Sequence, residues 1–276
     1  MAPLETIAFW IAVAIYALAG GGNVYALVFR NERFLSRMRV LAAVGLAAHT
    51  AAIVFRYAAQ GHLPWAGDYE TALSGGWFIV AFTLYAGARG LGGVAVATLP
   101  FTVLLMGFGV MRSPALTPLA ASLRSGWLAV HVFFAWLAFA AYALAMGAGV
   151  LYELKERDSK RSARNPIYER FPAQDRLEEL VFRWMVFGFL TDAVMIASGA
   201  IWARDLWGSY WSWDPVETWS VVTWLSYGLA IHLRLTRGWR GRRFTRLAVF
   251  AIAGMIVTFF GVTVVVESSN HFFNVR

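Results

Sequence analysis

The stretch Trp207-Gly-Ser-Tyr-Trp211-Ser-Trp213-Asp214-Pro215-Val-Glu217-Thr-Trp219-Ser220 lies between two long apolar segments. It holds four tryptophans and a tyrosine within 14 residues. Single tryptophans are common at a membrane surface, because an indole has an apolar body and one polar N–H group. So many of them, separated by small residues, predict a flat apolar wall with hydrogen-bond donors at its rim. Such a wall suits a large planar ligand.

The second half of this stretch has the residue pattern of a helix start. Asp214 is expected at the N-cap, Pro215 at the first helical position and Glu217 at the third, which is a capping-box arrangement. The aromatic loop is therefore expected to lie directly at the N-terminus of the following helix.

The composition is that of a membrane protein. Of the 276 residues, 59% are hydrophobic and 14% are charged, whereas soluble domains carry roughly 25% charged residues. A spanning helix needs about 20 mainly apolar residues. The sequence therefore predicts an all-α, polytopic membrane protein in which residues 1–276 form a single integral membrane domain. Eight segments are expected to span the membrane: 7–29, 40–58, 71–88, 94–111, 126–152, 181–203, 217–236 and 247–266.

The net charge is +8. We interpret the distribution of the basic residues as a signal of the orientation of the protein in the membrane, and not as a sign of nucleic-acid binding. Cytoplasmic loops of membrane proteins are enriched in Lys and Arg, and acidic residues interrupt the largest basic segment, so nucleic acid is not expected as a partner. Both termini and the tryptophan loop are then expected on the extracytoplasmic side of the inner (plasma) membrane. Most of the 24 Lys and Arg residues lie in four segments, which we expect in the cytoplasm: 30–39, 89–93, 153–180 and 234–246.

The chain contains no cysteine. It therefore forms no disulfide, has no thiol nucleophile and offers no thiolate to a metal. If thiol chemistry takes place at this protein, another molecule supplies the sulfur. The first apolar segment has no basic flank before it and no small-residue cleavage site after it, so we interpret it as a retained helix rather than a signal peptide.

Two histidines, His131 and His271, are expected at the outer face, at the level of the tryptophan loop. His232 and His49 are expected deeper in the membrane. Neutral imidazole is a common axial ligand of haem iron, although a lone histidine at an apolar boundary is more often satisfied by a hydrogen bond. The combination of an aromatic wall with two histidines at one level favours a planar porphyrin held by two axial ligands.

His49 and Asp192 fall in the middle of predicted spans, where an ionisable group is costly and usually faces the protein interior. His49 is either a neutral histidine bonded to a neighbouring helix, or an iron ligand or proton carrier. Asp192 is interpreted as a partner for Ser, Thr or His on an adjacent helix. In a third interpretation the aromatics form only an interfacial belt, and His49 and Asp192 line the pathway of a channel or ion transporter.

The motif Trp207-Gly-x-Tyr-Trp211-Ser-Trp213-Asp214-Pro215-x-Glu217-Thr-Trp219 resembles the tryptophan-rich signature of the haem-handling proteins of cytochrome c biogenesis. It is most similar to the CcsA (ResC) component of the system II synthase that attaches haem to c-type cytochromes. The resemblance spans about residues 49–271 and includes Gly199-Ala-x-Trp202-Ala. Val216 stands where the family often has lysine, and the residues around His271 also depart from the family pattern.

The resemblance implies that residues 204–219 form an extracytoplasmic haem-binding loop. His131 and His271 match the two external iron ligands, and His232 matches an intramembrane histidine. In related fused proteins the second intramembrane ligand belongs to the partner portion, and His49 is the candidate on this chain. The loop residues implied to bind the cofactor are Trp207, Tyr210, Trp211, Trp213, Asp214 and Trp219.

The resemblance also implies the chemistry and the partners. Haem b would be both bound ligand and substrate, and the thiols of an apocytochrome c Cys-x-x-Cys-His segment would add to its vinyl groups. The expected partners are a membrane subunit similar to CcsB (ResB), without which the chain is not expected to be active, and thiol-reducing thioredoxin-like proteins. The alternative is a haem exporter or carrier that hands haem to a separate chaperone without forming the bond.

Overall fold

The computed structural model describes residues 2–65, 67–112, 114–116, 119–120 and 123–262, which form helices and their connections with no strand among them. The α-helices are α1 (Pro3–Val28), α2 (Glu32–Gln60), α3 (Gly67–Ala86), α4 (Ala95–Arg112), α5 (Gly126–Ser159), α6 (Gln174–Trp207), α7 (Pro215–Arg237) and α8 (Gly241–Ile256). Short helical turns lie at η1 (Gly87–Leu91), η2 (Gly92–Val94), η4 (Pro166–Arg170) and η5 (Val257–Gly261). The prediction of an all-α protein is confirmed for this part of the chain.

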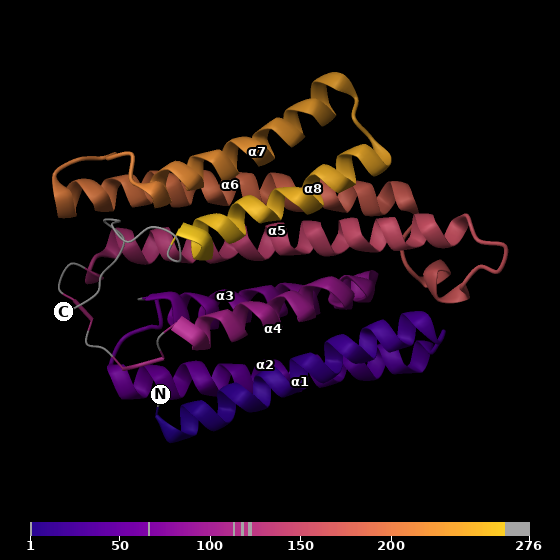
Figure 1. Cartoon of the computed structure of the whole chain (residues 1–276), viewed down its shortest axis with the longest axis horizontal. Coiled ribbons are helices and arrows are strands. Elements are labelled where there is room, and N and C mark those ends of the chain that lie inside the picture. The colour runs from indigo at the N-terminus through magenta and orange to yellow at the C-terminus, as the bar shows by residue number, and fades with distance from the viewer. Residues whose placement is uncertain (1, 66, 113, 117–118, 121–122, 263–276) are drawn as a thin grey trace.

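The helices run side by side along the long axis of the molecule (Figure 1). The pairs α1–α2 and α3–α4 lie on one side of α5, and α6, α7 and α8 lie on the other. Helix α5 packs most extensively against α6 and also contacts α3, α4 and α8. Its middle, from Ala138 to Ala145, is at most 1% exposed. Five of these eight residues are alanine, and small side chains let membrane helices approach closely.

In the part of the chain that the structure describes, six stretches are long and apolar enough to cross a membrane: Pro3–Val28, Glu32–Gln60, Gly67–Arg112, Gly126–Ser159, Gln174–Trp207 and Gly241–Gly261. The 46-residue stretch Gly67–Arg112 contains both α3 and α4, which separate at a turn where Gly90 has a φ of +86°. Helix α7 is long enough but not apolar enough to be counted among them. The chain is therefore a multi-pass membrane protein, and the count of eight crossings stays a prediction.

Several helices extend beyond the predicted spans. Helix α5 continues to Ser159 and α6 begins at Gln174, so segment 153–180 is partly helical instead of a loop. A run of apolar residues predicts the part of a helix that lies within the membrane. It does not predict where the backbone hydrogen bonding of the helix ends. The projecting turns are charged, and pairs four residues apart such as Lys160–Glu156 and Arg183–Glu179 support them.

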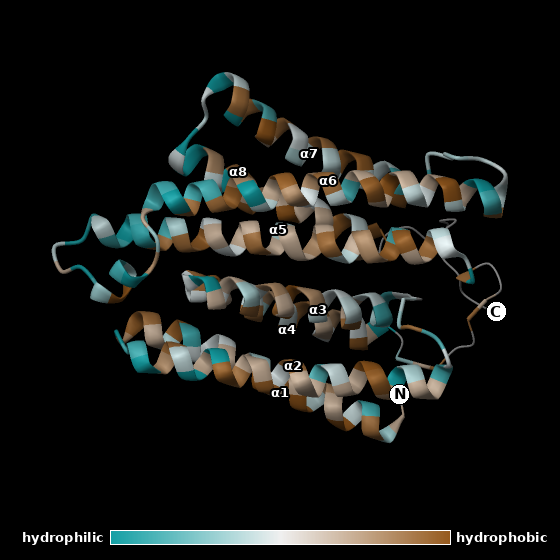
Figure 2. Cartoon of the chain, turned by 180° about the vertical axis from the view of Figure 1, so that it is seen from behind, coloured by the Kyte–Doolittle hydropathy of each residue, from teal (hydrophilic) through white to brown (hydrophobic). Residues whose placement is uncertain are grey.

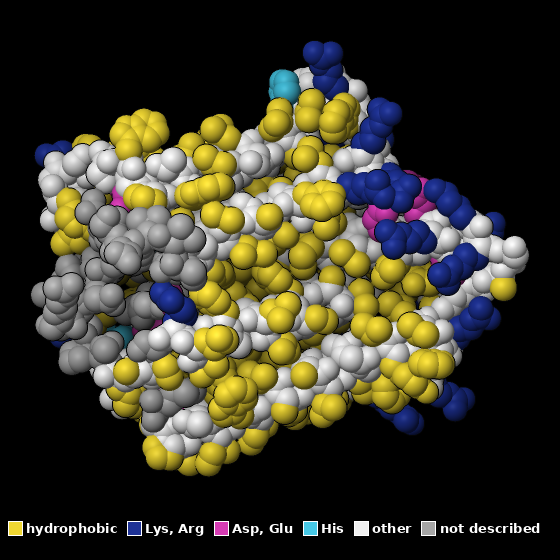
Figure 3. All heavy atoms as spheres, in the orientation of Figure 1, with side chains coloured by type: hydrophobic (Ala, Val, Ile, Leu, Met, Phe, Trp, Pro, Cys, Tyr) yellow, Lys and Arg dark blue, Asp and Glu magenta, His cyan; other side chains and the backbone are white. Residues whose placement is uncertain are grey.

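The basic residues gather at one end of the molecule (Figure 3). This end carries the α1–α2, α5–α6 and α7–α8 connections (Figure 1), and it is the more hydrophilic end in Figure 2. The predicted cytoplasmic loops thus lie together, with the tryptophan loop at the opposite end. Which end faces the cytoplasm, and the location of both termini, remain predictions.

A buried arginine joins α6, α7 and α8 at the basic end. Arg234 is 4% exposed, and its guanidinium lies between the rings of Phe182 and Phe244, 4.4 and 4.7 Å from their centroids. It pairs with Glu178 and Glu179 of α6. A charge buried at this depth is tolerated because it is paired and hydrogen-bonded.

A second buried arginine fixes the opposite end of the α1–α3 region. Arg56, 1% exposed, donates to Glu70 at 2.9 Å and to Glu5 at 3.4 Å. It also donates to the backbone carbonyls of Pro114 and Ala115, at 2.9 and 2.8 Å. These bonds tie three helices to the segment that follows α4 and so help to define the end of the molecule that contains the site.

Candidate functional site

The tryptophan loop begins and ends with defined helix caps. Helix α6 ends at Gly208, whose φ of +77° closes the helix and whose N–H donates to Arg204 O at 2.9 Å. Helix α7 starts with the predicted capping box: the Val216 N–H donates to Asp214 Oδ1 at 2.9 Å, and the Asp214 N–H donates to Glu217 Oε2 at 3.2 Å. The prediction for this helix start is confirmed.

Glu217 also shapes the loop itself. Its carboxylate, in a residue only 8% exposed, accepts the Ser212 N–H at 2.8 Å. Between these two contacts Trp213 has a φ of +57°, which is uncommon for a residue with a side chain. The Glu217 carboxylate therefore holds the chain in a sharp turn directly before α7.

The aromatic residues of the loop point in different directions. Tyr210 and Trp211 line a pocket, whereas Trp213 is 74% exposed and Trp219 is 40% exposed. The rings of Trp211 and Trp213 are nearly perpendicular, at 88°. Trp207 packs edge-on against Trp202, with 5.3 Å between their ring centroids. Within the described residues the loop tryptophans thus do not form a single flat wall.

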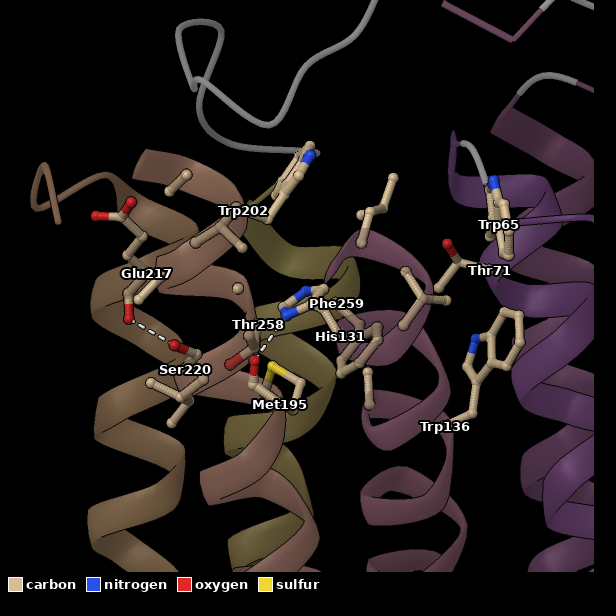
Figure 4. Close-up of a pocket in the computed structure, with 18 of the residues that line it drawn as sticks. Trp65, Thr71, His131, Trp136, Met195, Trp202, Glu217, Ser220, Thr258 and Phe259 are labelled. Carbon is tan, nitrogen blue, oxygen red and sulfur yellow. Dashed lines mark hydrogen bonds between the residues drawn. The ribbon is translucent and has the colours of Figure 1, made fainter. Parts of the chain in front are cut away.

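The pocket below the loop has a volume of about 210 Å³. Residues from α3, α5, α6, α7 and η5 line it together with the loop. His131 lies at its centre, between the α6–α7 side with Glu217 and Ser220 and the α3 side with Trp65 and Thr71 (Figure 4). The lining is mainly apolar and aromatic, which is typical of a site for an apolar ligand fixed by a few polar contacts.

His131 is held in a defined orientation. Its Nδ1 lies 2.8 Å from the Met195 carbonyl oxygen, and its ring stacks on Trp202 at 27° with 6.5 Å between centroids. Because a carbonyl only accepts, Nδ1 carries the proton and the lone pair of the neutral ring is on Nε2. A backbone bond to one ring nitrogen is the usual way in which proteins orient a metal-binding histidine.

Gly199 makes this position of His131 possible. A Cβ atom at residue 199 would lie 2.6 Å from His131 Nδ1, closer than atoms can pack. The sequence pattern around Gly199 pointed to the family, but the steric reason for the glycine is visible only in the structure.

Of the other predicted external and intramembrane iron ligands, His232 does not line this pocket. His232 is exposed on α7, two residues before the buried Arg234, so it lies on the helix face turned away from the bundle. His271 lies outside the described residues. Among the described residues no group of three or more His, Cys, Asp or Glu side chains could hold a metal.

His49 is buried and makes two hydrogen bonds within the protein. Its Nδ1 lies 3.2 Å from the Tyr16 hydroxyl and its Nε2 lies 2.8 Å from the Leu73 carbonyl. Iron ligation by His49 would require one of these bonds to break. The geometry is that of the first alternative, a neutral histidine bonded to neighbouring helices.

Asp192 has a partner on an adjacent helix, but the partner is a tyrosine instead of the predicted Ser, Thr or His. The Tyr142 hydroxyl of α5 donates to Asp192 Oδ2 at 3.1 Å. The Tyr142 ring stacks on Tyr227 of α7 at 3.5 Å and 2°. Tyr142 and Tyr227 belong to one buried cluster, and Tyr16 and Leu73, which hold His49, belong to another. Asp192 and His49 thus lie in separately packed regions, which does not favour a common ion pathway.

Several residues that line the pocket were not identified from the sequence as site residues: Trp65, Thr71, Trp136, Met195 and Phe259. They come from four separate segments of the chain. The sequence feature that could have identified Trp65 was its location in an outer loop. For Trp136 the feature was its position five residues after His131 on α5. Neither signal shows which way the side chain points.

Comparisons with known proteins agree with this architecture. The family model "Cytochrome C assembly protein" matches residues 11–269. The cytochrome c biogenesis protein CcsA of Synechococcus sp. (strain CC9605) is 30% identical over 251 residues, covering 82% of this chain and 83% of the relative. CcsA of Prochlorococcus marinus (strain NATL2A) is 32% identical over 260 residues, covering 82% of each protein.

A solved structure shares the fold. The protein described as "Cytochrome c Heme Lyase CcmF" superposes with a TM-score of 0.73 at 20% sequence identity, covering 93% of this chain. This chain spans 46% of the length of that protein, so the likeness concerns the fold alone. Together with the family match and the CcsA relatives, the helical fold and the tryptophan loop lead to one conclusion: the chain belongs to the cytochrome c assembly protein family and is of the CcsA type.

Proposed function

We propose that the pocket below the tryptophan loop receives haem and presents it to an apocytochrome c for covalent attachment. The observation that carries this proposal is the position of His131 in an aromatic pocket. The Met195 carbonyl accepts the Nδ1–H of its neutral ring, which places the lone pair on Nε2. Neutral imidazole is a common axial ligand of haem iron. Haem b is here the substrate of the protein rather than a permanent cofactor.

The size of the pocket is consistent with partial enclosure of haem. At about 210 Å³ it is smaller than the roughly 300–1,000 Å³ of pockets that enclose most of a ligand. It would hold one face and edge of the porphyrin and leave other parts accessible. Access is necessary, because the cytochrome must reach both the iron and the vinyl groups.

In the proposed reaction, a histidine of the Cys-x-x-Cys-His segment replaces one axial ligand, and two thiols add across the haem vinyl groups. In each addition sulfur bonds to one vinyl carbon and hydrogen to the other, so no net oxidation takes place. The absence of cysteine in this chain avoids a competing thiol. The contribution of the protein is positioning and exclusion of water, so proximity is the main catalytic effect.

The remaining family-implied residues complete the proposal. His271 is the second external ligand, and the loop residues Trp207, Trp213 and Trp219 contact haem or the cytochrome. His232, exposed on α7, meets haem at a surface shared with lipid or with a CcsB-like subunit before haem reaches the outer pocket. Thioredoxin-like proteins keep the cytochrome thiols reduced, and the loop end of the molecule faces the extracytoplasmic side.

The absorption spectrum of the purified complex with its partner subunit tests the ligand assignment. His131→Gly and His271→Gly are expected to lose most of the bound haem, and added imidazole is expected to restore it by filling the space of the lost ring. His62→Gly removes a histidine that does not line the pocket and is the matched control. An unchanged bis-histidine spectrum in both variants would show that the ligand assignment is wrong.

Attachment and simple transport of haem give different products. The complex is co-expressed with an apocytochrome c in a host that lacks its own maturation pathway. Attachment predicts cytochrome whose haem stays with the polypeptide after denaturation. Haem that is bound by the complex but never becomes covalent would support the alternative, a carrier that delivers haem to a separate chaperone.

A further inference from the structure

Two indole groups on the α3–α5 side of the pocket carry buried donors without acceptors. The Nε1 atoms of Trp65 and Trp136 are inaccessible to solvent and make no hydrogen bond in the described part of the chain. Trp136 is only 8% exposed as a residue. Proteins rarely bury a polar group without a partner, because its interaction with water is lost and not replaced.

Two indoles elsewhere in the bundle, on α3 and α7, have acceptors for their N–H groups. Trp77 Nε1 donates to the Thr50 hydroxyl at 2.8 Å, and Trp224 Nε1 donates to the Phe189 carbonyl at 3.1 Å. Neither of these two tryptophans lines the pocket, whereas Trp65 and Trp136 both do.

The surrounding structure holds both rings in place. Trp136 packs against Phe78 of α3, with 5.5 Å between ring centroids and 33° between planes. Trp65 follows Pro64, whose carbonyl accepts a hydrogen bond from the Ser74 hydroxyl at 2.7 Å. Packing against Phe78 thus holds the Trp136 ring, and the Ser74 bond holds the backbone directly before Trp65.

The chemistry of this side of the pocket selects an acceptor. An indole N–H only donates, so a cation or another donor cannot satisfy it. Thr71, which lies close to both tryptophans (Figure 4), adds a hydroxyl that can also donate. A carboxylate accepts several hydrogen bonds at once and forms stronger ones than a neutral acceptor.

The acidic residues of the pocket do not oppose such a ligand. Asp68 lies on the same side, but its carboxylate pairs with Arg112 Nε at 2.9 Å. Glu217 lies on the opposite side (Figure 4), and its carboxylate accepts the backbone N–H groups of Ser212 and Asp214. Both negative charges are thus already compensated by groups of the protein.

We propose that Trp65 and Trp136 recognise the carboxylates of the ligand and so determine which edge of it faces α3. This inference rests on the proposed haem-binding function. In haem b the two propionates lie on the half of the porphyrin opposite the two vinyl groups. Propionates held by Trp65 and Trp136 therefore direct the vinyl groups away from α3, toward the side of the pocket where the tryptophan loop lies and the thiols can approach.

The test compares haem with its dimethyl ester, in which both propionates are blocked. The complex with its partner subunit is stripped of haem and titrated with each compound. Trp65→Phe and Trp136→Phe remove the N–H and keep an aromatic ring. Each is expected to weaken binding of haem by roughly tenfold, the effect of one hydrogen bond to a charged group, and to weaken binding of the ester clearly less, because an ester carbonyl is only a neutral acceptor. Trp77→Phe and Trp224→Phe are the matched controls and should not discriminate between the two compounds.

The possible failures are distinguishable. If both pocket variants weaken haem and ester binding equally, or neither variant affects haem, the indoles only pack and the inference is wrong. If the wild-type complex binds the ester as tightly as haem, carboxylate recognition is excluded while haem binding stands. If it binds neither compound, the proposed function fails and the inference fails with it.

Discussion

At the residue scale, a missing side chain determines where His131 can lie. Gly199 on α6 leaves the space that the imidazole of α5 occupies, and the Met195 carbonyl one turn earlier fixes its orientation. The contact joins residues 64 positions apart on two consecutive helices. His131 therefore depends on a residue that carries no functional group.

Gly199→Ala is expected to lose haem nearly as completely as His131→Gly, because the added Cβ would lie 2.6 Å from His131 Nδ1 and displace the ring. The haem content and the Soret spectrum of the purified complex measure this. Gly107→Ala, where a Cβ would meet nothing within 4 Å, is the control. A Gly199→Ala protein with a normal spectrum would mean that His131 does not bind iron in the orientation described.

The sequence identified some site residues and not others for physical reasons. Imidazole is rare at a membrane boundary and stands out beside a cluster of tryptophans, so His131 was recognisable. The roles of Trp65 and Trp136 depend on what surrounds their nitrogens, and no sequence pattern records a missing acceptor. For His49 the sequence left two alternatives, and only the positions of Tyr16 and Leu73 show that both ring nitrogens are engaged.

At the scale of single elements, helix starts were more predictable than helix lengths. The capping box at Asp214 is local chemistry, with each hydrogen bond spanning two or three residues, so the sequence contains all of it. The far ends of α5 and α6 depend on charge pairs and on the buried Arg234, whose partners are more than 50 residues away. Apolar composition alone therefore predicted spans that are shorter than helices α5 and α6.

The capping role of Asp214 can be separated from the haem contact that the family resemblance implies. Asp214→Ser keeps a side-chain acceptor for α7, whereas Asp214→Ala removes it and should cost about 1 kcal/mol of stability. If Asp214 acts as the cap, the Ser variant retains haem and melting temperature and the Ala variant lowers both. Asp205→Ala, at the exposed end of α6, is the control. Loss of haem in the Ser variant at an unchanged melting temperature would instead indicate direct contact with the ligand.

At the scale of the whole molecule, the two ends differ in chemistry and are expected to face different compartments. The basic loops gather at one end and the tryptophan loop lies at the other. The sequence predicted this separation because loop charge is recorded directly in the residues. It could not determine whether α7, which is buried on its polar side at Glu217, Ser220 and Thr223, crosses the membrane.

Because the chain has no cysteine, single introduced cysteines can report the orientation. With a membrane-impermeant maleimide, Ser209→Cys is expected to react in intact cells. Arg89→Cys, Ser159→Cys and Thr236→Cys, all at exposed positions of the other end, are expected to react only after permeabilisation. Reaction of Thr236→Cys from outside would show that α7 does not cross and would exclude the eight-span arrangement.

Helix α5 carries both His131 and Trp136, the proposed contacts to the iron and to a carboxylate. Five residues of α-helix separate them by about 7.5 Å along the helix axis, and the backbone hydrogen bonds of the helix keep this spacing fixed. If α3 or the loop before α7 shifts to admit haem or release a finished cytochrome, the two contacts on α5 stay in register. The porphyrin would then keep one rotational setting throughout a reaction cycle, which would give every product the same stereochemistry.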